Sequence, residues 1–211
     1  MVKTHIDQWL YTFPWSQVIS GFWQKFPNPY TGHILSEDVY DRTITNDHIL
    51  ITKRLLTKTN KIPRWGEFLF SRGSASTIAF IIEESICDLK QKTFTTVTKN
   101  INLKSLMTIE ETCTYRPDKN NESSTICEKK VIATSDLFGF KTTLETFAIQ
   151  RYKKNQELAS LGLEFILHNL FLPHLPLPCI IGIKTLDTRT FSRKLSDKAK
   201  EFMKSSNNDS F

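Results

Sequence analysis

The ten residues KFPNPYTGHI, 25–34, mark the place where the chain changes from a helical pattern to a series of strands. Pro27 and Pro29 each fix the backbone φ, and each disfavours helical geometry at the residue before it. A helix that precedes this corner must therefore end here. The chain then leaves at a set angle, with Lys25 on one side of the corner and His33 on the other. We predict that the corner holds these two polar side chains in a fixed relation.

The segment before the corner has the apolar spacing of an amphipathic helix. Apolar residues recur three and four positions apart from Pro14 onward, which is typical of one buried helix face. We predict a helix that runs to the proline corner, and we assign Trp9, Trp15 and Trp23 to the core. The predicted face consists of Trp15, Val18, Ile19, Phe22, Trp23 and Phe26.

After the corner the pattern is that of strands with short connections, which favours an antiparallel meander. The loop 61–74 interrupts this series and carries apolar side chains of its own, which is typical of a lid or binding loop. A short helix that caps the core is the alternative for this loop. Asn46 and Asp47 form a plausible hairpin turn. The predicted strands are 2–11, 33–45, 48–58, 77–86, 93–101, 106–115 and 125–134.

A long helix is predicted from about residue 136 to about residue 170. A curved antiparallel sheet with a C-terminal helix is an α+β arrangement, and such a sheet can wrap the helix and leave a cavity between them. We expect residues 1–170 to form one domain and residues 171–211 to form a proline-rich linker with a mobile, weakly helical tail. The predicted apolar stripe of the helix is Leu144, Ala148, Tyr152, Ala159, Leu163, Ile166 and Leu170.

The charge balance favours anionic partners. Lys and Arg number 28 against 22 Asp and Glu, which gives a net charge of +6. Such an excess suits nucleic acid, an acidic protein or an anionic membrane surface, and a solubilising surface is the alternative. The N-terminus shows no signal or transit pattern, and prolines interrupt the most apolar stretch, 161–183, so no membrane-spanning helix is expected.

The four cysteines, at positions 87, 113, 127 and 179, form no CxxC pair, so neither a zinc site nor another cofactor is expected. We expect free thiols. A disulfide between Cys113 and Cys127, on either side of the polar loop 116–125, is the alternative.

Three segments together resemble the PRELI family of mitochondrial intermembrane-space lipid-transfer proteins. They are KFPNPYTGHIL (25–35), KRLLTKTNKIPRW (53–65) and DLFGFKTTLETFAIQRYKKN (136–155). The resemblance extends from Met1 to about residue 170. The second segment is most similar to the branch of the family that carries phosphatidic acid, and less similar to the branch associated with phosphatidylserine.

The resemblance implies a seven-stranded antiparallel sheet, curved against the long C-terminal helix and enclosing a lipid cavity. It also implies a phospholipid-transfer protein, not an enzyme, that shuttles phosphatidic acid between the outer and inner mitochondrial membranes and so supports cardiolipin synthesis. Contact with an anionic membrane surface and a small helical partner with twin CX9C motifs belong to the same implication.

The resemblance also implies site residues. Phe147 stands where the family has a Trp, and Leu158 stands where a further lysine is expected. The pocket is therefore one cation short, unless Lys153 or Lys154 substitutes. The implied headgroup-binding residues are Lys25, His33, Lys58, Lys61, Arg151 and Asn155, and the implied lid or membrane contacts are Trp65, Phe68 and Phe147.

Other functions fit the sequence less well than lipid transfer. An enzyme is disfavoured because the paired carboxylates Glu83-Glu84 and Glu110-Glu111 lie on strands, where neighbours point to opposite faces, and because no catalytic motif is present. A nucleic-acid binder is disfavoured because the basic residues are spread among elements without a recognition motif. A scaffold that only binds the helical partner, and a phosphatidylserine carrier, remain as alternatives.

Overall fold

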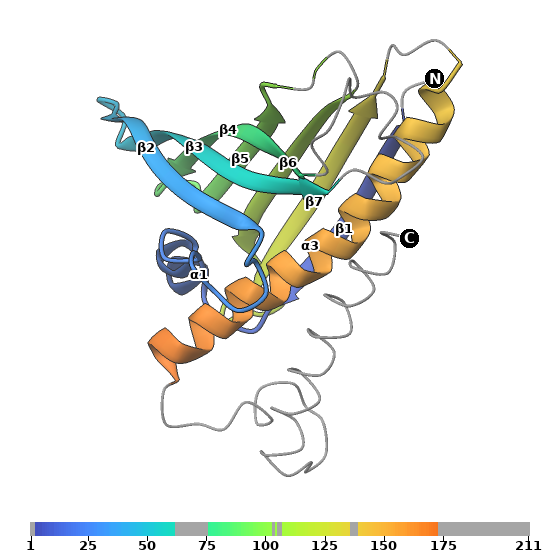
Figure 1. Cartoon of the computed structure of the whole chain (residues 1–211). Coiled ribbons are helices and arrows are strands. Elements are labelled where there is room, and N and C mark those ends of the chain that lie inside the picture. The colour runs from blue at the N-terminus through green and yellow to red at the C-terminus, as the bar shows by residue number, and fades with distance from the viewer. Residues whose placement is uncertain (1–2, 62–75, 103, 105–106, 136–138, 173–211) are drawn as a thin grey trace, which may run out of the picture.

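The computed structural model describes residues 3–61, 76–102, 104, 107–135 and 139–172. These residues form one seven-stranded antiparallel sheet in the order β1-β7-β6-β5-β4-β3-β2, together with two helices (Figure 1). The predicted α+β class, with a seven-stranded antiparallel sheet and a long C-terminal helix, is confirmed. The elements are β1 (Lys3–Tyr11), α1 (Trp15–Phe22), β2 (Ile34–Ile44), β3 (Ile49–Lys61), β4 (Ser76–Asp88), β5 (Thr93–Asn100), β6 (Thr108–Pro117), β7 (Thr125–Thr134) and α3 (Lys141–Phe171).

Helix α1 is shorter than its apolar pattern predicts. It follows Pro14 and ends at Phe22, and the backbone N–H of Trp23 closes the last turn on the carbonyl of Gly21. Phe26 therefore lies outside the helix. Pro27 restricts Phe26 directly, and in a continued helix its ring would also clash with the carbonyl of Trp23, the residue that follows the last turn.

An aromatic core lies between α1 and the sheet. Phe22 of α1 packs edge to face on Phe94 of β5, with ring centroids 4.7 Å apart. The indole Nε1 of Trp15 donates a 3.2 Å hydrogen bond to the carbonyl oxygen of Tyr115 on β6. Tyr11 and Tyr115 stack beside them with centroids 6.3 Å apart. Such offset and perpendicular ring pairs add stability beyond the burial of their area.

Helix α3 packs mainly on α1, β1 and β7, and runs diagonally along one side of the sheet in Figure 1. It begins at Lys141, later than predicted, and two positions of the predicted stripe, Ala159 and Leu170, are exposed. In the described part of the chain no helix has both the length and the apolar run needed to cross a bilayer. Beyond residue 172 the predicted linker and tail lie outside the description.

The face of the sheet that meets α1 and α3, here called the inner face, is not evenly packed. Near α1, the inner-face residues Phe94, Thr96, Cys113 and Tyr115 are buried. Further along the strands Leu56, Ala79, Val131 and Ala133 are also buried, but five of their inner-face neighbours keep accessible surface. These half-buried residues are Thr98, Glu111, Ile81, Ile109 and Lys58.

Candidate functional site

The proline corner is organised by Asn28. Its Oδ1 accepts hydrogen bonds from the backbone N–H groups of Tyr30 (2.9 Å) and Thr31 (3.1 Å), and its Nδ2 donates to the carbonyl of Lys25 (2.5 Å). The same side chain lies against α3 at Gly162, where a Cβ would stand 2.7 Å from Oδ1. Asn28 therefore holds the corner in its own conformation and also packs it against α3.

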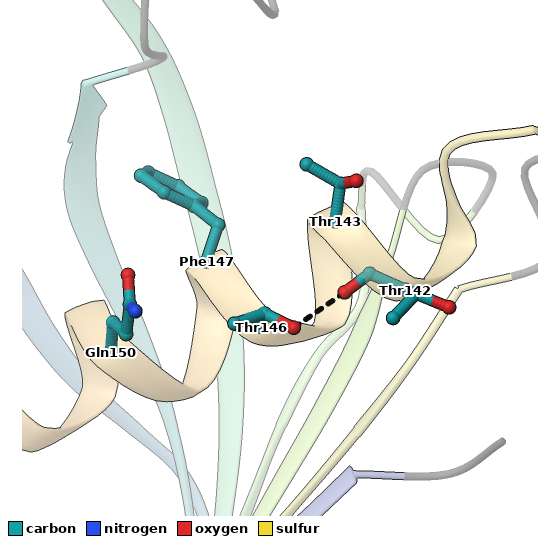
Figure 2. Close-up of a pocket in the computed structure, with 5 residues that line it drawn as sticks. All are labelled: Thr142, Thr143, Thr146, Phe147 and Gln150. Atoms are coloured by element: carbon teal, nitrogen blue, oxygen red, sulfur yellow. Dashed lines mark hydrogen bonds between the residues drawn. The ribbon is translucent and has the colours of Figure 1, made fainter.

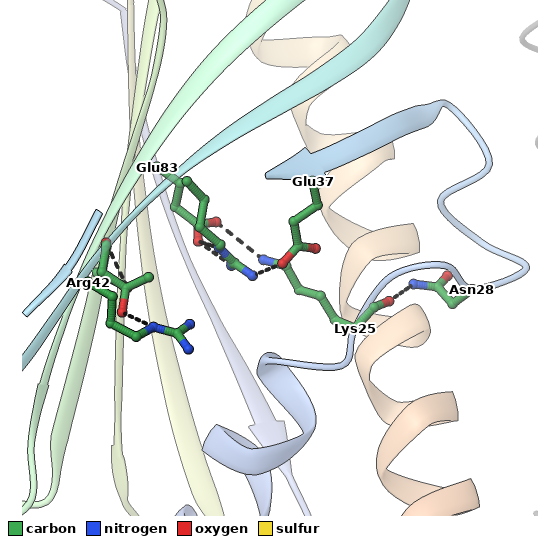
Figure 3. Close-up of polar contacts among 8 residues, drawn as sticks. Lys25, Asn28, Glu37, Arg42 and Glu83 are labelled. Carbon is green, nitrogen blue, oxygen red and sulfur yellow. Dashed lines mark hydrogen bonds and ion pairs between the residues drawn. The ribbon is translucent and has the colours of Figure 1, made fainter. Parts of the chain in front are cut away.

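Lys25 belongs to a buried network of four charged residues, here called the ion network. Its Nζ lies 3.3 Å from Oε2 of Glu83 and 3.8 Å from the centre of the Phe22 ring. Arg54 of β3 pairs with both Glu83 and Glu37, and its Nε is 2.8 Å from Glu83 Oε1. Figure 3 shows Lys25, Glu37 and Glu83 converging between strands and helices.

The charges of the ion network compensate one another. Burial lowers the pKa of Lys25, and Arg54 adds to this effect, while Glu83 opposes it. Burial alone would raise the pKa of Glu83, but Lys25 and Arg54 outweigh burial and hold it below its usual value. The positive charge of Lys25 is thus already matched by a carboxylate.

A second group of cations, here called the cation cluster, consists of His33, Lys58 and Arg151. His33 directly precedes β2, and its carbonyl accepts a 2.9 Å hydrogen bond from the N–H of Thr59 on β3. Burial, Lys58 and Arg151 lower the pKa of His33 to about 4. Burial and the charge of Arg151 also lower the pKa of Lys58. Basic side chains from three parts of the chain therefore act on one another, and of these His33 is neutral at pH 7.

One carboxylate acts on this cluster. Glu111, on the inner face of β6, is the negative group that opposes the lowering of the Lys58 pKa. Its Oε1 accepts hydrogen bonds from the Tyr152 hydroxyl (2.7 Å) and the Cys113 thiol (3.2 Å). Burial and then the Glu111 charge raise the pKa of Tyr152, so its hydroxyl stays a proton donor.

A hollow of about 390 Å³ adjoins the first turns of α3 (Figure 2). Phe147, predicted as a lid or membrane contact, lines it with its aromatic ring. The other lining residues, Thr142, Thr143, Thr146 and Gln150, lie on the same helix.

The remaining predicted site residues are placed in part. Asn155 is half-buried on α3, one turn beyond Arg151. Lys61 ends β3, but its side chain lies outside the described part of the chain, as do Trp65 and Phe68. The two lysines that might replace the missing cation, Lys153 and Lys154, are exposed on α3.

Sequence reasoning missed Arg54, Glu37, Glu83 and Glu111 as partners of the predicted cations. A signal was present, because strand alternation places Arg54 on the same face as Lys58. The paired carboxylates suggest catalysis when the sequence is read alone, and nothing in their spacing indicates that they are partners of the cations. The structure confirms that they do not gather in pairs, since Glu83 is buried while Glu84 is exposed.

The cysteines Cys87, Cys113 and Cys127 are free and buried. Within the described ranges, no group of three or more His, Cys, Asp or Glu side chains is arranged to hold a metal ion.

Solved structures with low sequence identity share the fold. The protein TTHA0849 from Thermus thermophilus aligns with a TM-score of 0.55 at 13% identity, over 80% of this chain and 99% of that one. The ZhuI aromatase/cyclase from Streptomyces sp. R1128 aligns with a TM-score of 0.53 at 7% identity, over 82% of this chain and 99% of that one. These likenesses concern the arrangement of the sheet and helices.

Sequence relatives are much more similar. The chain is 44% identical over 154 residues to PRELI domain-containing protein 1, mitochondrial, of Gallus gallus, covering 73% of this chain and 71% of the relative. It is 32% identical over 171 residues to Protein UPS1, mitochondrial, of Saccharomyces cerevisiae, covering 81% of this chain and 95% of the relative. Residues 16–172 match the PRELI-like family, and the chain therefore belongs to that family.

Proposed function

We propose that this protein is a phospholipid carrier that transfers phosphatidic acid between the two mitochondrial membranes through the intermembrane space and so supports cardiolipin synthesis. The observation that carries the proposal is the convergence of His33, Lys58 and Arg151 from three separate elements. Family membership and relatives that are named mitochondrial support the location.

The chemistry of the cation cluster suits a lipid phosphate. A phosphomonoester carries a charge near −1.5 to −2 at neutral pH, by analogy with phosphorylated side chains. Lys58 and Arg151 can replace its water and counter-ions with charge-assisted hydrogen bonds. Burial, and then its cationic neighbours, hold His33 neutral. An arriving anion offsets the influence of the neighbours, so His33 can take up a proton as the lipid binds.

The remaining predicted contacts take secondary places in this proposal. Asn155 supplies a neutral donor one turn from Arg151, and Lys61 extends β3 beyond Lys58. Lys25 keeps its predicted contact with the headgroup, but its charge is shared with Glu83, so we assign the main attraction to the cation cluster.

The acyl chains need an apolar environment. Ile81 and Ile109 keep accessible surface on the inner face and offer such an environment. Each CH₂ group moved from water into such surroundings contributes about 0.8 kcal/mol. We propose Phe147, Trp65 and Phe68 as the residues that contact the membrane during lipid exchange.

We also propose a small helical twin-CX9C protein as the partner of the folded domain. Support comes from apolar side chains that stay exposed on the outer face of the sheet, among them Ile78, Phe80, Ile86 and Val97. Co-expression followed by size-exclusion chromatography tests this partner: a stable one-to-one complex is expected, and separate elution would contradict it.

The test of function is transfer of fluorescent phospholipids between liposomes, with Lys58→Gln and Lys53→Gln as matched variants. Both lysines lie on β3, but Lys53 faces the other side of the sheet, where it pairs with Asp41 at 3.2 Å. We expect Lys58→Gln to abolish phosphatidic acid transfer and Lys53→Gln to retain it. Equal transfer by the two variants would remove the cation cluster from the function, and faster transfer of phosphatidylserine than of phosphatidic acid would reassign the lipid.

A further inference from the structure

Glu111 is an anomaly in a site that attracts anions. It lies half-buried on the inner face of β6, and Lys58 lies half-buried on the inner face of β3. A carboxylate in such a place repels an incoming phosphate. Its presence therefore calls for an explanation.

The position of Glu111 is fixed by its neighbours. Tyr152 donates a 2.7 Å hydrogen bond to Oε1, and the Cys113 thiol approaches the same oxygen at 3.2 Å. Tyr152 directly follows Arg151 on α3, so this hydrogen bond joins β6 to the helix that carries one of the cluster cations. Oε2 has no hydrogen bond within the part of the chain that the structure describes.

We propose that Glu111 is a built-in competitor of the lipid phosphate: it compensates Lys58 when the site is empty and limits how tightly a phosphate-bearing lipid is held. This inference rests on the proposed carrier function. A carrier must release its lipid at the second membrane, so a headgroup held too firmly is as unhelpful as one held too weakly. Glu111 therefore determines affinity and release without itself contacting the acyl chains.

Two electrostatic consequences follow. Replacing Glu111 with a neutral amide removes the carboxylate that opposes the charge of Lys58, so an anionic headgroup should bind more tightly and leave more slowly. Removing the Tyr152 hydroxyl frees the carboxylate to turn toward Lys58 and compete more strongly, so binding should weaken. The two substitutions act in opposite directions because both act through the same carboxylate.

The experiment compares Glu111→Gln with Glu110→Gln in the full chain. Glu110 is the adjacent residue on the opposite face, where it pairs with Lys99 at 3.1 Å, so it controls for a lost charge on the same strand. The probe is phosphatidylcholine vesicles with and without phosphatidic acid. We expect Glu111→Gln to raise the affinity for the phosphatidic acid vesicles about tenfold, to slow lipid release in stopped flow, and to leave the melting temperature near that of the parent protein. Glu110→Gln should leave affinity and release unchanged.

Tyr152→Phe and the double variant with Glu111→Gln separate this role from a structural one. Tyr152→Phe alone should weaken binding, whereas in the double variant its effect should vanish because its partner carboxylate is gone. A Glu111→Gln protein with unchanged or weaker binding, or a Tyr152→Phe effect that persists in the double variant, overturns the inference while the carrier function stands. A parent protein that binds both kinds of vesicle equally overturns the carrier function and this inference with it.

Discussion

Replacing Lys25 with Met tests whether the ion network stabilises the fold. Lys25 and Glu83 are both largely buried, with side chains 17% and 3% exposed. Removing one member of a buried ion pair costs about 3–5 kcal/mol, because the other charge is left without compensation. Here Glu83 keeps its bonds to Arg54, so we expect a smaller loss, about 2–3 kcal/mol. For a domain of this size that lowers Tm by about 4–12 °C.

Lys58→Met is the matched control for this prediction. Lys58 is also a partly buried lysine, but the structure gives it no ion pair among the residues it describes. Burial and Arg151 disfavour its charge and together outweigh the opposing influence of Glu111. Its removal should leave the free energy of unfolding unchanged or raised. Chemical unfolding followed by circular dichroism at pH 7 measures both variants. Equal stability of the two proteins, or a Lys58→Met variant that is the less stable, would refute the assignment of Lys25 to a stabilising network.

Two further predictions concern the corner and the histidine. Gly162→Ala should destabilise the fold by about 1–3 kcal/mol, because its Cβ would lie 2.7 Å from Asn28 Oδ1, whereas Gly32→Ala, with nothing within 4 Å, should be neutral in thermal unfolding. The pKa of His33 is about 4 in the folded protein and about 6.5 in the unfolded chain. The contribution of neutral His33 to the free energy of unfolding is therefore complete above pH 6.5 and is lost as the pH falls toward 4. That loss amounts to about 3 kcal/mol, and His33→Gln should flatten the stability profile in this window; a profile that His33→Gln leaves unchanged would contradict the folded-state pKa.

The contribution of His33 to lipid affinity should change with pH in the opposite direction to its contribution to stability. Because a bound phosphate favours protonated His33, the ratio of parent to His33→Gln affinity should rise as the pH is lowered from 7 to about 5. Taking this ratio removes the titration of the phosphate itself, which both proteins experience. A constant ratio in vesicle-binding assays would place His33 away from the headgroup.

Local patterns were enough to predict most of the fold. Alternation identifies Cys113 and Tyr115 as inner-face residues of one strand, and both are buried. The two prolines end α1 and start the turn into β2. The exact end of α1 at Phe22 and the start of α3 at Lys141 could not be read in this way, because helix ends depend on local hydrogen bonds that leave no apolar signature.

The site was harder to predict than the fold, because its contacts join residues far apart in the sequence. Lys25 meets Glu83 across 58 positions, and the meeting depends on the register that aligns Arg54 with Glu83 between β3 and β4. A single sequence shows which residues are cationic but not which of them have a carboxylate beside them. Glu111 illustrates the same limit, since its influence on Lys58 exists only once β6 and β3 lie in one folded sheet.

Native mass spectrometry of the protein, purified under gentle conditions from a phospholipid-containing cell, tests the central claim most directly. The account predicts one bound phospholipid per chain in the parent protein, identified by fragmentation as phosphatidic acid and absent or much reduced in Lys58→Gln. A parent protein that is empty under the same conditions would contradict a lipid-holding domain and favour a scaffold that only binds its helical partner.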